Sequence, residues 1–281
     1  MNAPLHGLRG GLRTIDLFCG AGGWSEGLKQ ACNELDLPIQ SHVCVNHDSF
    51  AISTHKANHP YAYHVQDSTD IVSPAEFGQR DIVIASPSCT HFSNARGAAP
   101  IHDQLRTPAG SVPSWIKRAR PAFFCIENVK EFLDWGPLLK RAYKGKKKGT
   151  PDPRKKGKDF QEQIVQPIRA LGYSVEWRIL TCADYGDPTT RKRLFIVGRR
   201  DGKPVEWPEP THQKGSTWVP ARSIINFNNP TKLLRDRPKQ LVPNTLKRIE
   251  AGIRKYWGPY AEQFLVVLRG TSDRQIQASP P

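Results

Sequence analysis

Seven apolar runs of strand length alternate with segments of helical spacing, and this alternation constrains the fold more than any other feature. The runs lie near 13–19, 41–46, 61–65, 81–85, 122–126, 173–181 and 193–198. Apolar spacing typical of helices covers 22–36, 47–57, 113–119 and 159–171. The pattern predicts an α/β fold with a mostly parallel sheet and helices on both faces. Ligand sites in such folds lie where strands end, so the residues that follow each run are the first candidates for function.

The first apolar run leads into a glycine-rich turn. Residues 14–23 read TIDLFCGAGG, and a segment of helical spacing follows. Gly20, Gly22 and Gly23 let a ligand approach the backbone and aim amide groups and a helix N-terminus at it. The third glycine of the dinucleotide fingerprint would fall at Ser25, which disfavours a nicotinamide or flavin cofactor.

The run at 81–85 leads into SPSCTHFS, residues 86–93. Pro87 stiffens this segment and disfavours a helix. Cys89 therefore stands on a stiff loop at a strand end, which makes its thiol a candidate nucleophile. The competing interpretation is a structural thiol, because an isolated cysteine usually behaves as a small buried apolar residue.

Two further strand ends carry charged or amide side chains. The run FFCIENV ends in Glu127 and Asn128, and Arg191 and Arg193 stand at the start of the run LFIVG. The two arginines alternate, so they would share a face of an extended segment. A solvent-exposed glutamate with no catalytic role is the alternative for Glu127.

Taken in this order, the motifs resemble those of the DNA cytosine methyltransferases that methylate carbon 5. DLFCGAGG resembles the cofactor motif of that family, and Pro87-Ser88-Cys89-Thr90 resembles its Pro-Pro-Cys-Gln nucleophile motif. Glu127-Asn128-Val129 matches its Glu-Asn-Val motif. Residues 189–193, TTRKR, correspond to its Gln-x-Arg-x-Arg motif. The resemblance covers roughly residues 13–200.

The sequence departs from the family pattern at four positions: Ser88 replaces the second proline, Thr90 and Thr189 replace glutamines, and Asn46 stands where many members have an acidic ribose ligand. These departures concern the fine geometry of the site.

The resemblance implies a Rossmann-like fold that binds S-adenosylmethionine and acts on a cytosine flipped out of double-stranded DNA. By resemblance, the cofactor ligands are Asp16, Phe18, Gly20, Gly22, Gly23, Asn46, Asp67 and Pro87. The implied catalytic residues are Cys89, Glu127, Asn128, Arg191 and Arg193.

The chemistry explains these residue types. Carbon 5 of cytosine is a poor nucleophile until a thiolate adds to carbon 6. Free cysteine is mostly protonated at neutral pH, so positive charge from Arg191 and Arg193 would help Cys89 ionise. A proton-sharing Glu127 would stabilise the electron density that thiolate addition places on ring N3.

Charge fits a nucleic-acid partner, since 41 Lys and Arg outnumber 26 Asp and Glu to give a formal charge of +15. The densest basic run, 138–160, is expected to be a mobile loop that either follows phosphates or is merely solvated.

The six cysteines show no CxxC pair, so we expect neither disulfides nor a metal site. Free cysteines without a disulfide framework indicate a cytoplasmic location. No signal peptide or membrane-spanning segment is evident.

Past residue 200 the sequence becomes rich in proline and turn residues. We expect a catalytic domain over 1–200 and a partial target-recognition region over 201–281. The late Gly-Asn motif of the family is missing, which suggests a truncated reading frame, one half of a split enzyme or a natural remnant. Three functions stay open: a monomeric DNA methyltransferase of restriction–modification type, acting alone or with a complementing chain; an inactive fragment that only binds DNA or cofactor; and an RNA cytosine methyltransferase.

Overall fold

The computed structural model describes residues 10–87, 108–145, 149–226, 240–256, 264–265 and 276–277. Its centre is a seven-stranded sheet with the order β3-β2-β1-β4-β5-β7-β6. The strands are β1 (Leu12–Leu17), β2 (Ile39–Val45), β3 (Tyr63–Val65), β4 (Ile82–Ala85), β5 (Phe123–Asn128), β6 (Ser174–Thr181) and β7 (Lys192–Arg199). Strands β1 to β5 pair in parallel, whereas β7 runs antiparallel to β5. All seven predicted strands and the mostly parallel sheet are confirmed.

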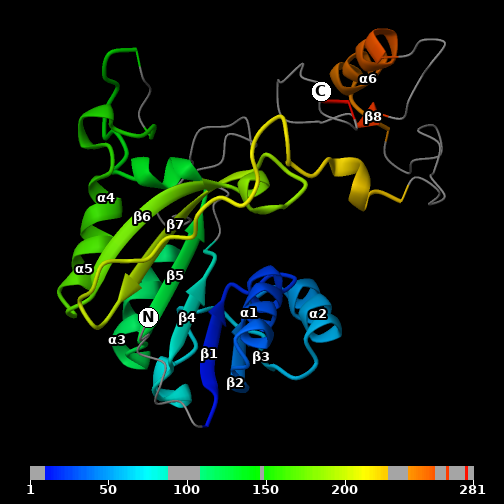
Figure 1. Ribbon diagram of the computed structural model, residues 1–281. Coiled ribbons are helices and arrows are strands. Elements are labelled where there is room, and N and C mark those ends of the chain that lie inside the picture. The colour runs from blue at the N-terminus through cyan, green and yellow to red at the C-terminus, as the bar shows by residue number, and fades with distance from the viewer. Residues whose placement is uncertain are drawn as a thin grey trace. The chain divides into compact units, whose positions relative to one another are not determined.

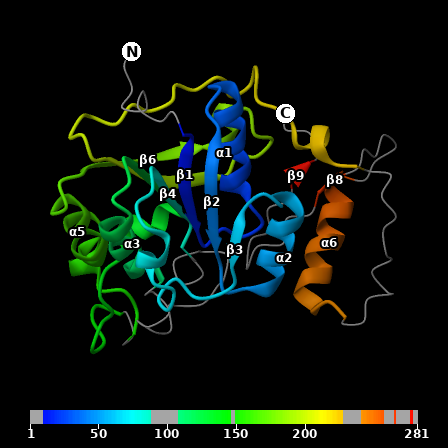
Figure 2. The same ribbon diagram turned by 90° about the horizontal axis from the view of Figure 1, so that it is seen from below.

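Helices cover both faces of this sheet (Figures 1 and 2). They are α1 (Gly23–Glu34), α2 (Ser49–Asn58), α3 (Val112–Ala119), α4 (Lys158–Phe160) and α5 (Gln166–Arg169). Short 3₁₀ turns cover Pro74–Phe77, Pro108–Ser111, Lys130–Asp134, Pro153–Lys155, Cys182–Tyr185 and Ala221–Ile224. The predicted α/β fold with helices on both faces is thus confirmed.

The helix predicted over 159–171 is interrupted. A π-helical segment, Gln161–Val165, lies between α4 and α5. Pro167 lacks an N–H group and cannot continue a regular α-helical hydrogen-bond ladder, so the chain takes a wider turn just before it. The segment still packs well, because Ile164, Val165 and Ile168 are all buried.

The two faces of the sheet differ in chemistry. On β1, Ile15 and Leu17 belong to the main apolar core, which includes residues of α3, α4 and α5. Thr14 and Asp16 alternate with them and are also fully buried, so the opposite face of the same strand carries polar side chains. That polar face lies under α1 and α2.

The chain forms two compact units, of which one is Met1–Ser93, Ala99–Leu180 and Arg193–Trp207, and the other is Asn94–Ala98, Thr181–Lys192 and Pro208–Pro281. The segment before β7 joins the second unit through Asp184, whose carbonyl accepts hydrogen bonds from the amides of Thr211 and His212 at 2.9 and 3.0 Å. The Trp218 indole also donates to the Asp184 carboxylate at 3.0 Å. The second unit therefore takes in Thr181–Lys192 and begins again at Pro208, whereas residues 201–207 belong to the first unit.

The second unit contains α6 (Pro243–Tyr256) and the two-residue strands β8 (Phe264–Leu265) and β9 (Ile276–Gln277), which pair antiparallel. Within the described residues, none of the helices has the length and apolar character that crossing a bilayer requires.

Candidate active site

Strand register brings three of the predicted motifs to one edge of the sheet. Leu17 at the end of β1 pairs with Ala85 at the end of β4, and Ala85 pairs with Ile126 in β5. Because these strands are parallel, the glycine turn, the segment after β4 and the end of β5 all leave the sheet on the same side. Strand β7 is antiparallel to β5, so it begins on that side, near Arg193.

The glycine turn has two glycines that the backbone conformation favours and one that leaves open surface. Gly20 and Gly22 have φ of +54° and +97°, and a Cβ atom at Gly22 would also collide with the ring of His59. A Cβ at Gly23 would meet no described atom within 4 Å. Neither backbone conformation nor packing therefore explains Gly23, whereas a ligand lying against the backbone would. The turn leads directly into α1, whose N-terminal amides suit the carboxylate of S-adenosylmethionine.

Of the other predicted cofactor ligands, Asn46 and Asp67 follow β2 and β3, Phe18 and Pro87 follow β1 and β4, and Asp16 lies within β1. The Asn46 amide N–H donates to the Val65 carbonyl at 3.1 Å, and the Asn46 side chain accepts from the Asp48 amide at 2.9 Å. Asp67 is exposed two residues after β3. Asp16, in contrast, is completely enclosed, and its carboxylate accepts a hydrogen bond from Ser25 at 2.9 Å. Burial raises the pKa of Asp16 to about 7, opposed by the Ser25 hydrogen bond.

Two hydrogen bonds fix the start of the loop that carries Cys89. Asn128 is buried, and its side-chain amide donates to the Pro87 carbonyl at 3.2 Å. The Ser86 amide donates to the Leu17 carbonyl at 3.0 Å. Cys89 itself lies outside the described residues, as do Ser88 and Thr90. The contact to Pro87 ties Asn128 to the start of this loop.

Glu127 and Arg193 form an ion pair at the same edge. Arg193 Nε lies 2.8 Å from Glu127 Oε1, and the two side chains are 15% and 24% exposed. The pairing follows from topology, since Glu127 is opposite Phe195 in the antiparallel register and Arg193 is two residues earlier on β7. Arg191 is exposed and belongs to the second unit. The structure thus gives Arg193 a carboxylate partner that the sequence did not reveal.

The sequence analysis also did not predict a buried polar network below the glycine turn. His42 on β2, His55 on α2 and Ser25 on α1 are buried and joined by hydrogen bonds. The sequence signal was the alternation of His42 and Cys44 in an apolar strand, which places both side chains on one face.

Comparison with known proteins agrees with the motifs. The family model described as C-5 cytosine-specific DNA methylase matches residues 12–247. The Type II methyltransferase M.AgeI of Thalassovita gelatinovora is 31% identical over 237 residues, which are 81% of this chain and 47% of that protein. The Type II methyltransferase M.AquIA of a Picosynechococcus strain is 30% identical over 254 residues, covering 83% of this chain and 90% of that protein.

Solved structures show the same fold. Dnmt2 methyltransferase of S. pombe superposes with a TM-score of 0.53 at 17% identity, over 93% of this chain and 69% of that one. A DNMT2 mutant of Spodoptera frugiperda gives a TM-score of 0.56 at 17% identity, over 85% and 65%. The chain spans about half of M.AgeI and most of M.AquIA. On the family model and these relatives, the chain belongs to the C-5 cytosine-specific DNA methylase family.

Proposed function

We propose that this chain methylates carbon 5 of a cytosine flipped out of double-stranded DNA, with S-adenosylmethionine as methyl donor and Cys89 as nucleophile. The observation that carries the proposal is the Glu127–Arg193 ion pair, which lies at the same sheet edge as the glycine turn and the Asn128-braced loop. The restriction–modification role follows from the Type II names of the relatives.

In the proposed reaction, the Cys89 thiolate forms a bond to carbon 6, and the electron pair of the carbon 5–carbon 6 double bond moves toward ring N3. Glu127, oriented by Arg193, stabilises N3 through a hydrogen bond that strengthens as charge develops there. S-adenosylmethionine, held by the glycine turn, would supply the methyl group from its sulfonium to carbon 5 and leave as S-adenosylhomocysteine. Loss of the carbon 5 proton and departure of the Cys89 thiolate restore the aromatic ring.

The decisive assay measures transfer of labelled methyl groups to duplex DNA and identifies the product base. We expect 5-methylcytosine in DNA, formed by the chain alone or after addition of a chain that supplies a complete recognition region. Label in RNA but not in DNA would support an RNA methyltransferase. Binding of DNA or cofactor without transfer under either condition would support an inactive fragment.

S-adenosylmethionine is expected to bind the glycine turn in preference to NAD, because the turn lacks the third glycine of the dinucleotide fingerprint. Titration calorimetry compares the two ligands. Alanine in place of Gly23 should weaken S-adenosylmethionine binding by about tenfold or more, since its Cβ would enter the open surface without meeting a described atom within 4 Å. Gly27→Ala is the matched control, because Gly27 is exposed on the same helix and also has open space around it. NAD binding without S-adenosylmethionine binding would contradict the cofactor assignment.

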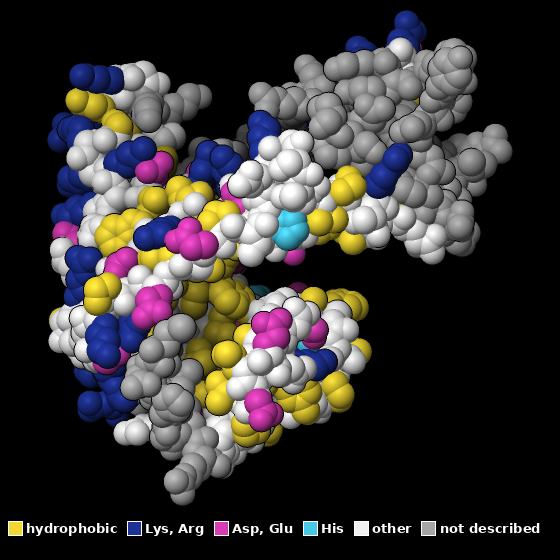
Figure 3. Space-filling view, in the orientation of Figure 1, with side chains coloured by type: hydrophobic (Ala, Val, Ile, Leu, Met, Phe, Trp, Pro, Cys, Tyr) yellow, Lys and Arg dark blue, Asp and Glu magenta, His cyan; other side chains and the backbone are white. Residues whose placement is uncertain are grey.

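Basic side chains gather over the edge of the molecule that carries α4 and α5 (Figure 3). Exposed basic residues of the loop that precedes α4 include Lys140, Arg154, Lys155 and Lys156. Some already have acidic partners, since Arg154 pairs with Asp152 at 2.7 Å and Lys156 with Asp134 at 2.9 Å. We propose that this loop contacts DNA phosphates, and that its other lysines contribute most of the salt-sensitive attraction.

The double variant Lys140→Ala/Lys155→Ala is therefore expected to weaken DNA binding at low salt and to flatten its salt dependence. If both lysines neutralise phosphates, the slope of log K against log[salt] falls in magnitude by about 0.9 for each. Fluorescence anisotropy with a labelled duplex at several salt concentrations measures the slope. Lys29→Ala serves as the control, because Lys29 pairs with Glu26 on α1. An unchanged slope would mean that the loop is merely solvated.

A further inference from the structure

The polar face of the sheet below α1 and α2 collects side chains that seldom share a buried space. In the parallel register, Thr14 pairs with His42 and Asp16 pairs with Cys44. Cys44 in turn pairs with His64 on β3. Residues paired in register point to the same side of a sheet, so these side chains all face the same helices. Helix α2, which packs on this face of the sheet, contributes His55.

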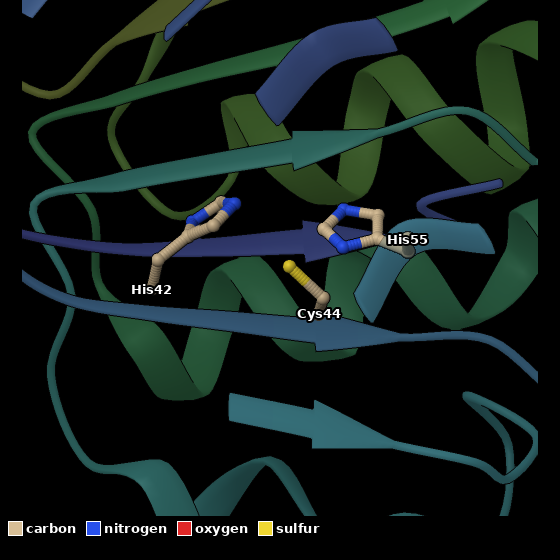
Figure 4. A group of neighbouring side chains, drawn as sticks. All are labelled: His42, Cys44 and His55. Atoms are coloured by element: carbon tan, nitrogen blue, oxygen red, sulfur yellow. The ribbon is translucent and has the colours of Figure 1, made fainter. Parts of the chain in front are cut away.

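Three of these residues direct metal-binding atoms toward one another. His42 and Cys44 come from β2 and His55 from α2, and their ring nitrogens and sulfur turn toward a common space (Figure 4). The three donor atoms lie within 4.8 Å of one another. The residues are 2%, 0% and 0% exposed, so bulk water does not solvate them. The Ser25 hydroxyl marks the point of convergence, 2.7 Å from His42 Nε2, 3.0 Å from His55 Nε2 and 3.9 Å from Cys44 Sγ.

The outward nitrogens of the two histidines have the partners that metal ligands need. His42 Nδ1 lies 2.6 Å from Thr14 Oγ1, and His55 Nδ1 lies 2.8 Å from His64 Nε2. When both Nδ1 atoms carry the proton, they donate to these partners and both Nε2 lone pairs face the convergence point. The Thr14 hydroxyl then donates to the Ser41 carbonyl, at 3.4 Å. Such outer hydrogen bonds fix ring orientation in metal sites.

Asp16 supplies the second, independent observation. Its Oδ2 accepts from Ser25, which is bonded to both histidines. Its Oδ1 is buried and has no hydrogen-bond partner among the described residues. A network held only by protons satisfies the histidines and Ser25 but leaves this oxygen unpaired, which is costly in a buried site. A cation bound in this network would stabilise the buried carboxylate electrostatically.

We propose that His42, Cys44 and His55 form a structural site for a borderline divalent cation, with Zn²⁺ the best match and the Asp16 carboxylate, bonded to Ser25, as a nearby counter-charge. Two imidazole nitrogens and a thiolate are ligands that Zn²⁺ takes in tetrahedral geometry. Binding requires the Ser25 hydroxyl to rotate away from the point of convergence. The sequence predicted no metal because it lacks CxxC pairs, but this set depends on strand register.

The site would tie α2 to β2 directly behind the glycine turn. His59 on the same side makes a 3.1 Å contact from Nε2 to the Gly22 carbonyl, and Ser25 lies in the first turn of α1. A cation here would therefore stiffen the support of the proposed cofactor turn without touching any reacting atom.

Cobalt titration of the complete, tag-free protein, first freed of metal with a chelator, tests the proposal. We expect one Co²⁺ per chain, with the intense visible bands of a tetrahedral site and a near-ultraviolet thiolate-to-cobalt band, and displacement of both by one equivalent of Zn²⁺. Cys44→Ser should lose the thiolate band, whereas Cys32→Ser, another buried cysteine, should keep it. Absence of the bands in the wild-type protein, or a thiolate band that survives Cys44→Ser, would overturn the site.

A second variant keeps the test decisive should Cys44→Ser fail to fold. Thr14→Val preserves side-chain shape but removes the partner of His42 Nδ1. Loss of such an outer partner is expected to weaken Zn²⁺ affinity by about 10–100-fold, measured by competition with a chromophoric chelator. Unchanged affinity in Thr14→Val would contradict His42 as a ligand.

Discussion

Replacing Cys89 with serine is expected to abolish covalent trapping of the enzyme on DNA and to lower methyl transfer by more than about 10³-fold. A serine hydroxyl does not ionise near neutral pH, whereas a thiol with a lowered pKa does. The hydrogen bonds from Asn128 to Pro87 and from Ser86 to Leu17 hold the start of the loop independently of residue 89, so the fold should tolerate the change.

Duplex DNA with 5-fluorocytosine at the target position provides the measurement. Fluorine cannot leave carbon 5 as a proton does, so the bond between the enzyme and carbon 6 persists and appears as a shifted band on a denaturing gel. Any missing recognition region is supplied in the assay. Cys125→Ser is the matched control, since Cys125 lies on β5 two residues before Glu127. An adduct that persists in Cys89→Ser, or that disappears in Cys125→Ser, would assign the nucleophile elsewhere.

The strands could be predicted because their chemistry is local. Buried parallel strands appear as short apolar runs, and each run became a strand with bounds within a few residues of the expected ones. The interruption before Pro167 was harder to foresee, since a proline in an apolar helical pattern predicts a break or a kink but not the π-helical turn that accommodates it.

The candidate site could be predicted only as a set of strand ends. Parallel topology guarantees that residues after β1, β4 and β5 share an edge, which is why the glycine turn, Pro87 and Glu127 meet there. The ion pair between Glu127 and Arg193 required knowledge that β7 runs antiparallel to β5. The sequence had suggested that Arg193 would favour the Cys89 thiolate. The structure gives Arg193 Glu127 as a partner, whereas Cys89 lies outside the described residues, so its proposed attraction to Arg193 stays a prediction.

The buried polar network shows a different limit. No short sequence motif joins the three residues of this network. His42 and Cys44 alternate on β2, and His55 comes later in the sequence, within α2. Their proximity depends on the register between β1, β2 and β3 and on the placement of α2. Each residue alone is unremarkable in sequence, so only the assembled face reveals the cluster.

Glu127→Gln is expected to lower turnover by about 10²–10⁴-fold while leaving the fold intact. Glutamine keeps the size of the side chain but can neither share a proton with ring N3 nor carry the charge that pairs with Arg193. Turnover is measured under single-turnover conditions, with circular dichroism as the check of folding. Glu162→Gln is the control, because Glu162 is exposed and pairs only with Lys158, at 3.5 Å. Wild-type turnover in Glu127→Gln would reject its catalytic role.

Arg193 decides whether the ion pair serves catalysis. Arg193→Lys keeps the positive charge but loses the planar guanidinium that holds Oε1 through Nε at 2.8 Å. If Arg193 acts by orienting Glu127, its loss reduces turnover only while the carboxylate is present. The double variant Glu127→Gln/Arg193→Lys should then be no slower than Glu127→Gln alone, a non-additivity typical of residues in one network. Independent, multiplying losses would show that Arg193 instead contributes through its own contact with DNA or the loop of Cys89.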